Sequence, residues 1–193
     1  MGRLEFRIFA RRLSALRLRL RGLYHIESQE SRTDTYLLQS NPMHSFKIRA
    51  DRELDLKIKL GKVGEYERWH PMGAVQLPAS RADLLGAFEG AEGLPPLAPY
   101  QHYDAEQLVE AFARCGARAL AVHKVRVRFT APSVQLEIAR LTGVNGSAET
   151  CSLEARAAGP INLLREELGL QSHRNESYPS WLVEQFNSKV SMV

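Results

Sequence analysis

Alternation of apolar and charged residues with a period of two runs through much of the chain and is clearest over residues 45–60. Lys47 and Arg49 alternate with apolar residues there, and the same pattern continues through 54–60. Successive side chains of a strand point to opposite faces, so this pattern predicts two strands that each carry their charges on one face. The short polar stretch at 50–53 predicts the turn of a hairpin between them.

Five further segments alternate in the same way and predict strands. They are residues 4–10, 33–38, 122–130, 134–141 and 148–155. A polar stretch at 143–147 predicts a hairpin between the last two strands. Residues 27–32 are expected to form a charged loop, and Pro71 predicts that any strand over 63–76 stops there or lies at a sheet edge.

Capping residues and proline positions predict helices at 80–88, 104–115, 160–168 and 179–186. The second is the best marked, because Asp104 stands at its N-cap, Gln107 at the capping-box position and Gly116 after its end. Residues 11–21 are rich in Arg and Leu, and their spacing fits a short helix first and strand alternation after it.

The amphipathic helices must bury their apolar stripes, and the apolar faces of the strands are the available partners. Helices outside a curved sheet would turn the charged faces inward, and about eight antiparallel strands would close into a barrel. We therefore predict an α+β fold, a closed antiparallel β-barrel with helices packed on its outside, in a single domain spanning residues 1–193. The alternative is that each charged face is the solvated side of an open sheet.

Composition narrows the function only slightly. The chain has 193 residues, 26 basic and 22 acidic, and the net charge of +4 suits an anionic ligand but is too small to indicate nucleic acid. Cys115 and Cys151 are far apart and form no CxxC pair, which indicates neither a disulfide framework nor a zinc site. No apolar run is long enough for a membrane span and the N-terminal residues are rich in charge, so we expect a cytoplasmic protein.

Cations repeat on one face of strand after strand, whereas carboxylates stand at the polar positions of others. Crowded cations in a partly desolvated space repel each other by about 1 to 4 kcal/mol per pair, and a bound polyanion would relieve this repulsion. Carboxylates nearby would hold a hard divalent cation, Mg or Mn, that bridges phosphate oxygens.

The order and spacing of these segments resemble the CYTH or triphosphate tunnel metalloenzyme superfamily. Proteins of this family have an eight-stranded antiparallel tunnel in which Lys and Arg grip a triphosphate and acidic residues bind a divalent metal. They include inorganic tripolyphosphatase, thiamine triphosphatase and class IV adenylate cyclase. The similar segments are DTY at 34–36, FKIR at 46–49, LDLKIK at 54–59, KVRVR at 124–128, LEI at 136–138 and SLE at 152–154.

The resemblance implies roles for individual residues. The implied phosphate ligands are Arg7, Lys47, Arg49, Lys57, Lys59, Lys124, Arg126 and Arg128. The implied ligands of Mg or Mn are Glu5, Glu137 and Glu154, and the implied catalytic residues are Glu5, Lys57 and Arg126. The first strand departs from the ExExK motif of the family, because one register gives Glu5, Arg7 and Phe9 and the other gives Arg3, Glu5 and Arg7. Either register puts a cation in place of one glutamate.

Three hypotheses therefore stay open. The first is metal-dependent hydrolysis of a triphosphate: tripolyphosphate, a nucleoside triphosphate or thiamine triphosphate. The second, motivated by the altered ExExK motif, is a catalytically impaired module that binds a polyphosphate, a nucleotide or a phosphorylated RNA end without turnover. The third is a class IV-type adenylate cyclase. The sequence contains no Gly-rich phosphate loop and no GxSxG motif, so neither motif indicates a different class of enzyme.

Overall fold

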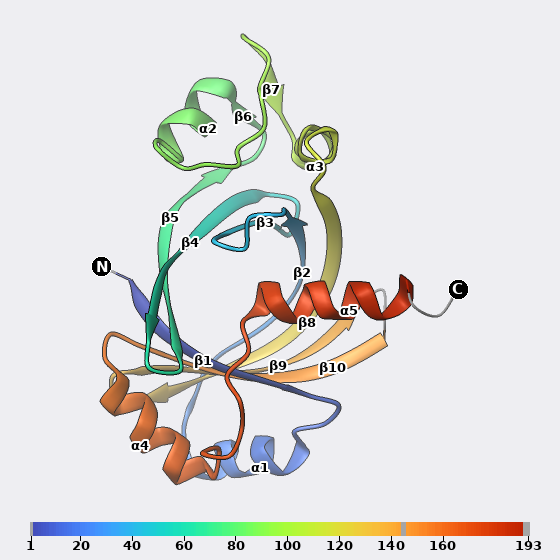
Figure 1. The fold of residues 1–193 in the computed structure, drawn as a ribbon. Helices are drawn as coiled ribbons and strands as arrows, with labels where there is room; N and C mark the ends of the chain where they lie inside the picture. The colour runs from blue at the N-terminus through green and yellow to red at the C-terminus, as the bar shows by residue number, and fades with distance from the viewer. Residues whose placement is uncertain (1, 144–145, 191–193) are drawn as a thin grey trace. The chain divides into compact units, whose positions relative to one another are not determined.

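The computed structural model describes residues 2–143 and 146–190, and their strands close into a barrel (Figure 1). The strand order is β1-β10-β9-β8-β2-β3-β4-β5, which confirms the predicted α+β fold with an antiparallel barrel of about eight strands. The barrel strands are β1 (Arg3–Ala10), β2 (Ile26–Leu38), β3 (His44–Arg49), β4 (Glu53–Val63), β5 (Tyr66–Gln76), β8 (Arg118–Ala131), β9 (Val134–Gly143) and β10 (Gly146–Ala155).

Five helices and a small second sheet complete the described part of the chain. The helices are α1 (Ser14–Leu23), α2 (Arg81–Ala87), α3 (Ala105–Arg114), α4 (Ala158–Leu168) and α5 (Tyr178–Val190), and the small sheet pairs β6 (Ala79–Ser80) with β7 (His102–Tyr103). Within the described residues, every helix is too short or too polar to cross a membrane.

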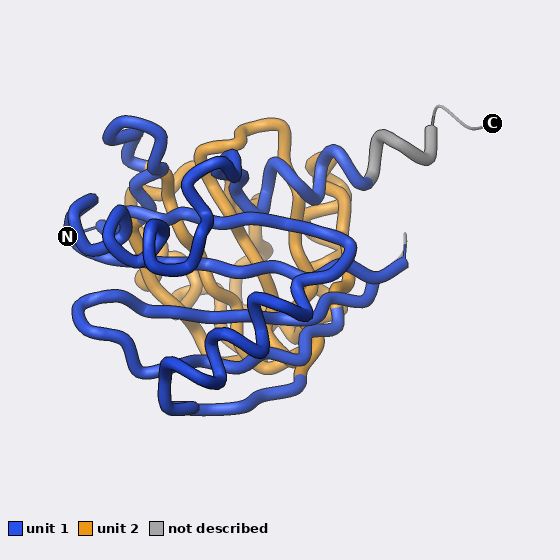
Figure 2. The backbone as a smooth tube through the Cα atoms, turned by 90° about the horizontal axis from the view of Figure 1, so that it is seen from below, with its two compact units in different colours: residues 1–31, 60–69, 123–193 blue, residues 32–59, 70–122 orange. Residues whose placement is uncertain are grey.

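The chain divides into two compact units, which Figure 2 colours separately. Unit 1 comprises residues 1–31, 60–69 and 123–193, and unit 2 comprises residues 32–59 and 70–122. Each unit combines segments that are not continuous in sequence, and each has its own apolar core.

In unit 1, the apolar face of β1, β8, β9 and β10 packs against α1 and α4, which lie on the same side of these strands in Figure 1. Phe6 and Leu153 on the strands are fully buried together with Leu20 of α1 and Ile161 of α4. Because side chains alternate along a strand, the charged residues of these strands occupy the face opposite the two helices.

In unit 2, the apolar face of β3 and β4 packs against α2 and α3. The ring of Phe46 lies 5.8 Å from that of Phe88 and 5.0 Å from that of Phe112, and Leu56 is fully buried beside them. The charged residues of β3 and β4 again share the opposite face.

The predicted hairpin at 45–60 is confirmed as β3 and β4. Ala50 and Asp51 have φ angles of 47° and 56°, and positive φ at two consecutive residues is typical of the type I′ turn that suits the twist of a two-stranded hairpin. The turn fixes the register, in which Lys47 faces Asp55 and Ser45 faces Lys57.

One prediction of local structure was wrong, and two were right in one of their alternatives. Residues 27–32 belong to strand β2 rather than to a loop, because backbone hydrogen bonds within the barrel define a strand whatever the polarity of its side chains. The ambiguous segment 11–21 contains the start of helix α1, which begins at Ser14 and continues to Leu23, so the helix is confirmed and the strand alternation after it is not. Strand β5 does not stop at Pro71, but Pro71 lies beyond the stretch that pairs with β1, where proline removes no hydrogen bond from that ladder, as expected at an edge. In the predicted turn at 143–147, residues 144 and 145 lie outside the described part.

The capping box predicted for α3 is present. The Asp104 carboxylate accepts a hydrogen bond from the Gln107 N–H at 2.9 Å, and the Gln107 side chain accepts one from the Asp104 N–H at 3.0 Å. We expect Asp104→Ala to lower the free energy of unfolding by about 1 kcal/mol in urea denaturation. Asp104→Asn keeps a capping oxygen and serves as the control, so an equal loss in both variants would contradict this explanation.

Candidate functional site

A group of charged residues on β3 and β4, which we call the lysine cluster, lies on the charged face of unit 2. It consists of Lys47, Arg49, Asp55 and Lys57. Lys47 and Asp55 face each other across the hairpin, and Arg49 and Lys57 occupy the neighbouring positions on the same face. The strand period therefore brings three cations and one carboxylate together.

Asp55 is shared by two of these cations. Its Oδ2 atom lies 3.1 Å from Lys47 Nζ and accepts a hydrogen bond from Arg49 Nη2 at 2.5 Å. Burial alone would raise the pKa of Asp55, but the charges of Lys47 and Arg49 outweigh it and lower the pKa. The carboxylate is therefore firmly ionised and neutralises part of the positive charge that the sequence led us to expect on this face.

Lys47 remains in an unfavourable position for a cation. Burial lowers its pKa, Asp55 raises it in part, and Arg49 and Lys57 lower it further, so the net pKa is below the ordinary lysine value. Only 14% of its side chain is exposed. The carboxylates of Asp55 and Asp34 thus do not offset burial and the neighbouring cations, and an additional negative group would stabilise the charged form of Lys47.

The flanks of the lysine cluster carry further charge. Asp34 faces Arg49 across β2 and β3, is fully buried, and accepts a hydrogen bond from Arg32 Nε at 2.7 Å. Lys57 and Lys59 on β4 are half-buried. Four of the predicted phosphate ligands therefore lie in unit 2: Lys47, Arg49, Lys57 and Lys59.

The charged face of unit 1 is dominated by carboxylates. Glu5 on β1 faces Glu67 on β5 and also Glu154 on β10, so that three glutamates stand directly opposite one another on neighbouring strands. We call Glu67, Glu5 and Glu154 the carboxylate row. Like charges in facing positions of a sheet repel, and this row needs cations close by.

Arg7 lies next to the carboxylate row. It is 7% exposed, and its Nε donates a hydrogen bond to Glu5 Oε1 at 2.7 Å. Burial alone would lower the pKa of Arg7, but the negative charges of Glu5, Glu137 and Glu154 outweigh it, so the pKa is raised. One guanidinium thus interacts with all three of the glutamates that were predicted to hold a metal ion.

The cations of β8 also have partners, which are carboxylates or an aromatic ring. Arg126 donates hydrogen bonds to Glu30 and, at 3.1 Å, to Glu137 Oε2, whereas Arg128 lies 3.7 Å from Glu137 with 42% of its side chain exposed. Lys124 is buried, and its Nζ lies 4.4 Å from the centre of the Tyr178 ring. The three predicted phosphate ligands on β8 therefore lie on the same strand face, each beside a partner from its own unit.

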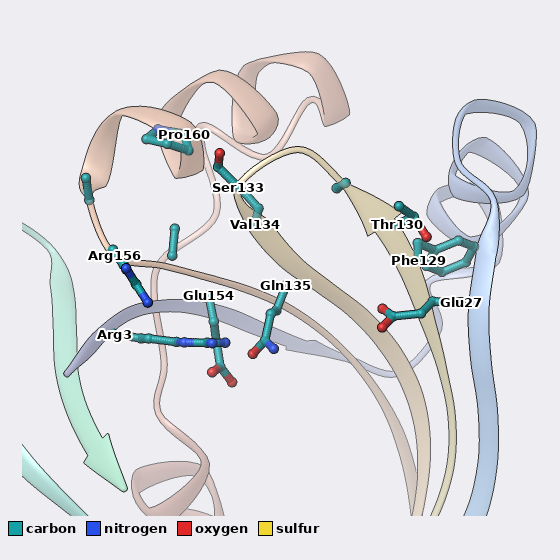
Figure 3. Close-up of a pocket in the computed structure, with 13 residues that line it drawn as sticks. Arg3, Glu27, Phe129, Thr130, Ser133, Val134, Gln135, Glu154, Arg156 and Pro160 are labelled. Atoms are coloured by element: carbon teal, nitrogen blue, oxygen red, sulfur yellow. The ribbon is translucent and has the colours of Figure 1, made fainter. Parts of the chain in front are cut away.

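A pocket of about 710 Å³ opens at one end of this face in unit 1 (Figure 3). It is lined by Arg3, Glu27, Gln135, Glu154 and Arg156, among others. Figure 3 shows the Arg3 side chain extending toward Glu154. Glu154, the third predicted metal ligand, therefore lies in an open pocket with arginine nearby.

These residues do not fit a divalent metal ion in their observed arrangement. Glu5 and Glu137 direct carboxylate oxygens at Arg7 and Arg126, where a metal would need them. Across residues 2–143 and 146–190, no three His, Cys, Asp or Glu side chains are grouped so that they could hold a metal ion. The expectation of a Mg or Mn site at Glu5, Glu137 and Glu154 thus meets guanidinium groups bonded to two of the three glutamates.

Sequence reasoning missed several residues of the two clusters. Asp34 and Tyr178 touch or face predicted phosphate ligands, and Glu30 was assigned to a loop although it bonds Arg126. The alternation over 54–60 does place Asp55 on the face of Lys57, but it does not show that Asp55 pairs with Lys47 and Arg49. Tyr178 could not have been found, because its contact with Lys124 depends on the path of the chain after α4.

Comparisons with known proteins show the fold but no family. No family model matches the chain, and no curated protein matches it. Among solved structures, a conserved hypothetical protein from Pyrococcus furiosus is 17% identical, with 91% of this chain and 98% of that chain covered and a TM-score of 0.55. A protein from Pyrococcus horikoshii OT3 is 15% identical, with 94% and 99% covered and a TM-score of 0.55.

A third solved structure, from Bacillus halodurans, is described as a candidate adenylate cyclase. It is 11% identical to this chain, with 92% of this chain and 97% of that chain covered and a TM-score of 0.53. At these identities the likeness concerns the backbone only. The chain therefore has the same barrel fold as these three proteins over nearly its whole length.

Proposed function

We propose that this protein binds a small molecule that carries a triphosphate, such as tripolyphosphate or a nucleoside triphosphate, through the lysine cluster of unit 2. The proposal depends on one observation above all. Lys47 is buried, and burial together with the nearby cations Arg49 and Lys57 lowers its pKa even though the carboxylates of Asp55 and Asp34 act in the opposite direction. A phosphate group supplies the missing negative charge.

The chemistry of the cluster suits phosphate oxygens. Lys47 and Lys57 each offer up to three N–H donors, and Arg49 offers a planar fork. Each charge-assisted hydrogen bond to a phosphate oxygen contributes about 1.5 to 3 kcal/mol, and the bound anion also returns the Lys47 pKa toward its ordinary value. In the free protein the charged form of Lys47 is thus disfavoured, and a bound phosphate group would make it more favourable.

The fold and the sequence support a triphosphate in particular. The chain has the barrel of a protein described as a candidate adenylate cyclase, and adenylate cyclases act on a nucleoside triphosphate. It also carries segments whose order and spacing along the chain resemble the CYTH superfamily, with the altered ExExK motif at Arg3, Glu5 and Arg7. On this basis we propose that it is a divergent member of that superfamily.

We assign no hydrolytic step to the protein. Of the implied catalytic residues, Glu5 is bonded to Arg7, and Arg126 is bonded to Glu30 and Glu137. The arrangement supports binding without metal-dependent turnover better than it supports a phosphohydrolase. Hydrolysis and cyclisation are instead tested directly by the experiment that follows.

Isothermal titration calorimetry with tripolyphosphate, ATP, thiamine triphosphate, an RNA oligonucleotide with a 5′-triphosphate and orthophosphate tests the proposal. We expect at least one triphosphate to bind roughly 100-fold more tightly than orthophosphate, because additional phosphate groups reach additional cations. Phosphate release and product chromatography in the same samples report hydrolysis or cyclic AMP formation. The proposal fails if none of the triphosphates binds, and rapid phosphate release that a Lys57→Ala, Lys59→Ala variant loses would establish the enzyme instead.

A further inference from the structure

The carboxylate row places three like charges side by side, two of them on buried side chains. Glu67, Glu5 and Glu154 face one another on neighbouring strands, where opposed side chains lie about 5 Å apart. Glu5 and Glu67 are 8% and 9% exposed, so water screens them little. A cation in or beside this row would offset the repulsion among its like charges.

The next row of the same strand face supplies that cation. Arg7 on β1 faces Ser152 on β10, and Ser152 faces Glu137 on β9. Serine is small, so the long side chain of Arg7 has room above it. The guanidinium bonds Glu5 at 2.7 Å and interacts electrostatically with Glu137 and Glu154 as well.

The surroundings of Arg7 hold its side chain in this position. Its Nη1 atom lies 3.5 Å from the Thr150 hydroxyl, and its guanidinium carbon lies 5.1 Å from the centre of the Tyr178 ring. Its backbone is also fixed, because the Arg7 N–H donates to the Asn175 side chain at 2.8 Å and its carbonyl accepts from the Glu176 N–H at 2.9 Å. Arg7 is therefore bound on several sides by the protein itself.

We infer that Arg7 is the resident cation of the glutamates on the charged face of unit 1. It takes the place that a divalent metal ion would have among Glu5, Glu137 and Glu154. A guanidinium is permanently charged, presents several donors in a planar fork and cannot dissociate from the chain. This positive charge is therefore present beside the glutamates at any metal concentration. Where the proposed function holds, it follows that triphosphate binding needs no Mg or Mn bound to these glutamates.

Metal titration of ligand-free protein tests the inference without relying on polyphosphate binding. After treatment with EDTA and its removal, the wild-type protein is expected to show no change in melting temperature with Mn²⁺. Arg7→Gln removes the cation that is bonded to Glu5 and lies close to Glu137 and Glu154, and we expect Mn²⁺ to raise the melting temperature of this variant by roughly 5 to 10 °C at about 100 times the Kd. Arg7→Lys keeps a charge at this position and is the matched control, expected to behave as wild type.

Two results would overturn the inference. One is stabilisation of the wild-type protein by Mn²⁺ that Glu137→Gln removes, and the other is a folded Arg7→Gln variant that Mn²⁺ does not stabilise. If Arg7→Gln does not fold, Mn²⁺ binding to the wild-type protein, followed by electron paramagnetic resonance, decides the question. Absence of binding supports the inference, and binding that Glu137→Gln abolishes refutes it.

A further arm separates this inference from the proposed function. Tripolyphosphate is titrated into the wild-type protein in EDTA and, separately, in Mg²⁺. Binding in EDTA supports both, whereas binding that occurs only with Mg²⁺ refutes the resident-cation inference and leaves the proposed function intact. Binding in neither condition refutes the proposed function, and the metal titration then still decides the role of Arg7.

Discussion

Replacement of Lys47 by methionine is expected to weaken tripolyphosphate binding by roughly 10- to 150-fold, which corresponds to the loss of one charge-assisted hydrogen bond of about 1.5 to 3 kcal/mol. Methionine keeps most of the apolar stem of lysine and fills the same space. Asp55 retains its 2.5 Å hydrogen bond from Arg49, so no carboxylate is left alone. Calorimetric titration of both proteins measures the change.

The same substitution should not lower the stability of the free protein. Because the Lys47 pKa is lowered, its charged form is less favourable in the folded than in the unfolded chain. We therefore expect the free energy of unfolding of Lys47→Met to equal or slightly exceed that of the wild type. Lys62→Met, on β4 at an exposed position, is the matched control. It should change neither the affinity for tripolyphosphate nor the free energy of unfolding. A Lys47→Met variant that binds as tightly as Lys62→Met would remove Lys47 from the site.

The lowered pKa of Lys47 also predicts how tripolyphosphate affinity and the stability of the free protein depend on pH. A bound polyanion favours protonated Lys47, so wild-type affinity should fall as pH rises through the folded-state pKa, below the ordinary lysine value of 10.5. The free protein should gain stability from this group over the interval between the two pKa values, because there the unfolded chain binds the proton and the folded chain does not. Lys47→Met should show neither trend. Titrations and urea unfolding between pH 7 and 10 would detect both.

The faces of the barrel strands could be predicted from sequence because period-two alternation is a property of each strand alone. Phe46 and Ile48 on one side, with Lys47 and Arg49 on the other, fix which face packs against helices. The partners of each charge could not be predicted, since they depend on register. That Asp55 faces Lys47 follows from the turn at Ala50 and Asp51, where neither residue is the glycine or asparagine that signals a type I′ turn most clearly.

The altered ExExK motif shows a second limit of the sequence. Both registers place Glu5 and Arg7 on one strand face, so the sequence identifies a cation beside a glutamate but not its role. The structure adds two facts: Glu5 faces glutamates on both neighbouring strands, and small Ser152 separates Arg7 from Glu137. Contacts between β1 and strands that are distant from it in sequence therefore decide whether Arg7 is available to a ligand or occupied by the protein.

Arg165 of α4 is the residue of unit 1 whose loss should cost the most stability among the charged side chains. Its Nη1 donates to Glu65 at 2.5 Å and to the Tyr66 hydroxyl at 2.7 Å, and its Nη2 donates to the carbonyls of Gln171 and His173 at 3.1 and 3.3 Å. It thereby connects β5 to the segment between α4 and α5. That segment continues to Asn175, which hydrogen-bonds the backbone of Arg7.

We expect Arg165→Met to lower the free energy of unfolding by about 3 kcal/mol, because buried acceptors lose their donors and part of an ion pair is removed. Glu65 is 51% exposed, so its share of this loss is small. Arg165→Lys restores the charge without the planar fork and should recover only part of the loss. Arg156→Met, at an exposed position of the same unit, should stay within about 0.5 kcal/mol of wild type in urea unfolding. A loss of less than about 1 kcal/mol in Arg165→Met would mean that Asn175 and Glu176 are held against Arg7 by their own contacts, and that the position of Arg7 does not depend on α4.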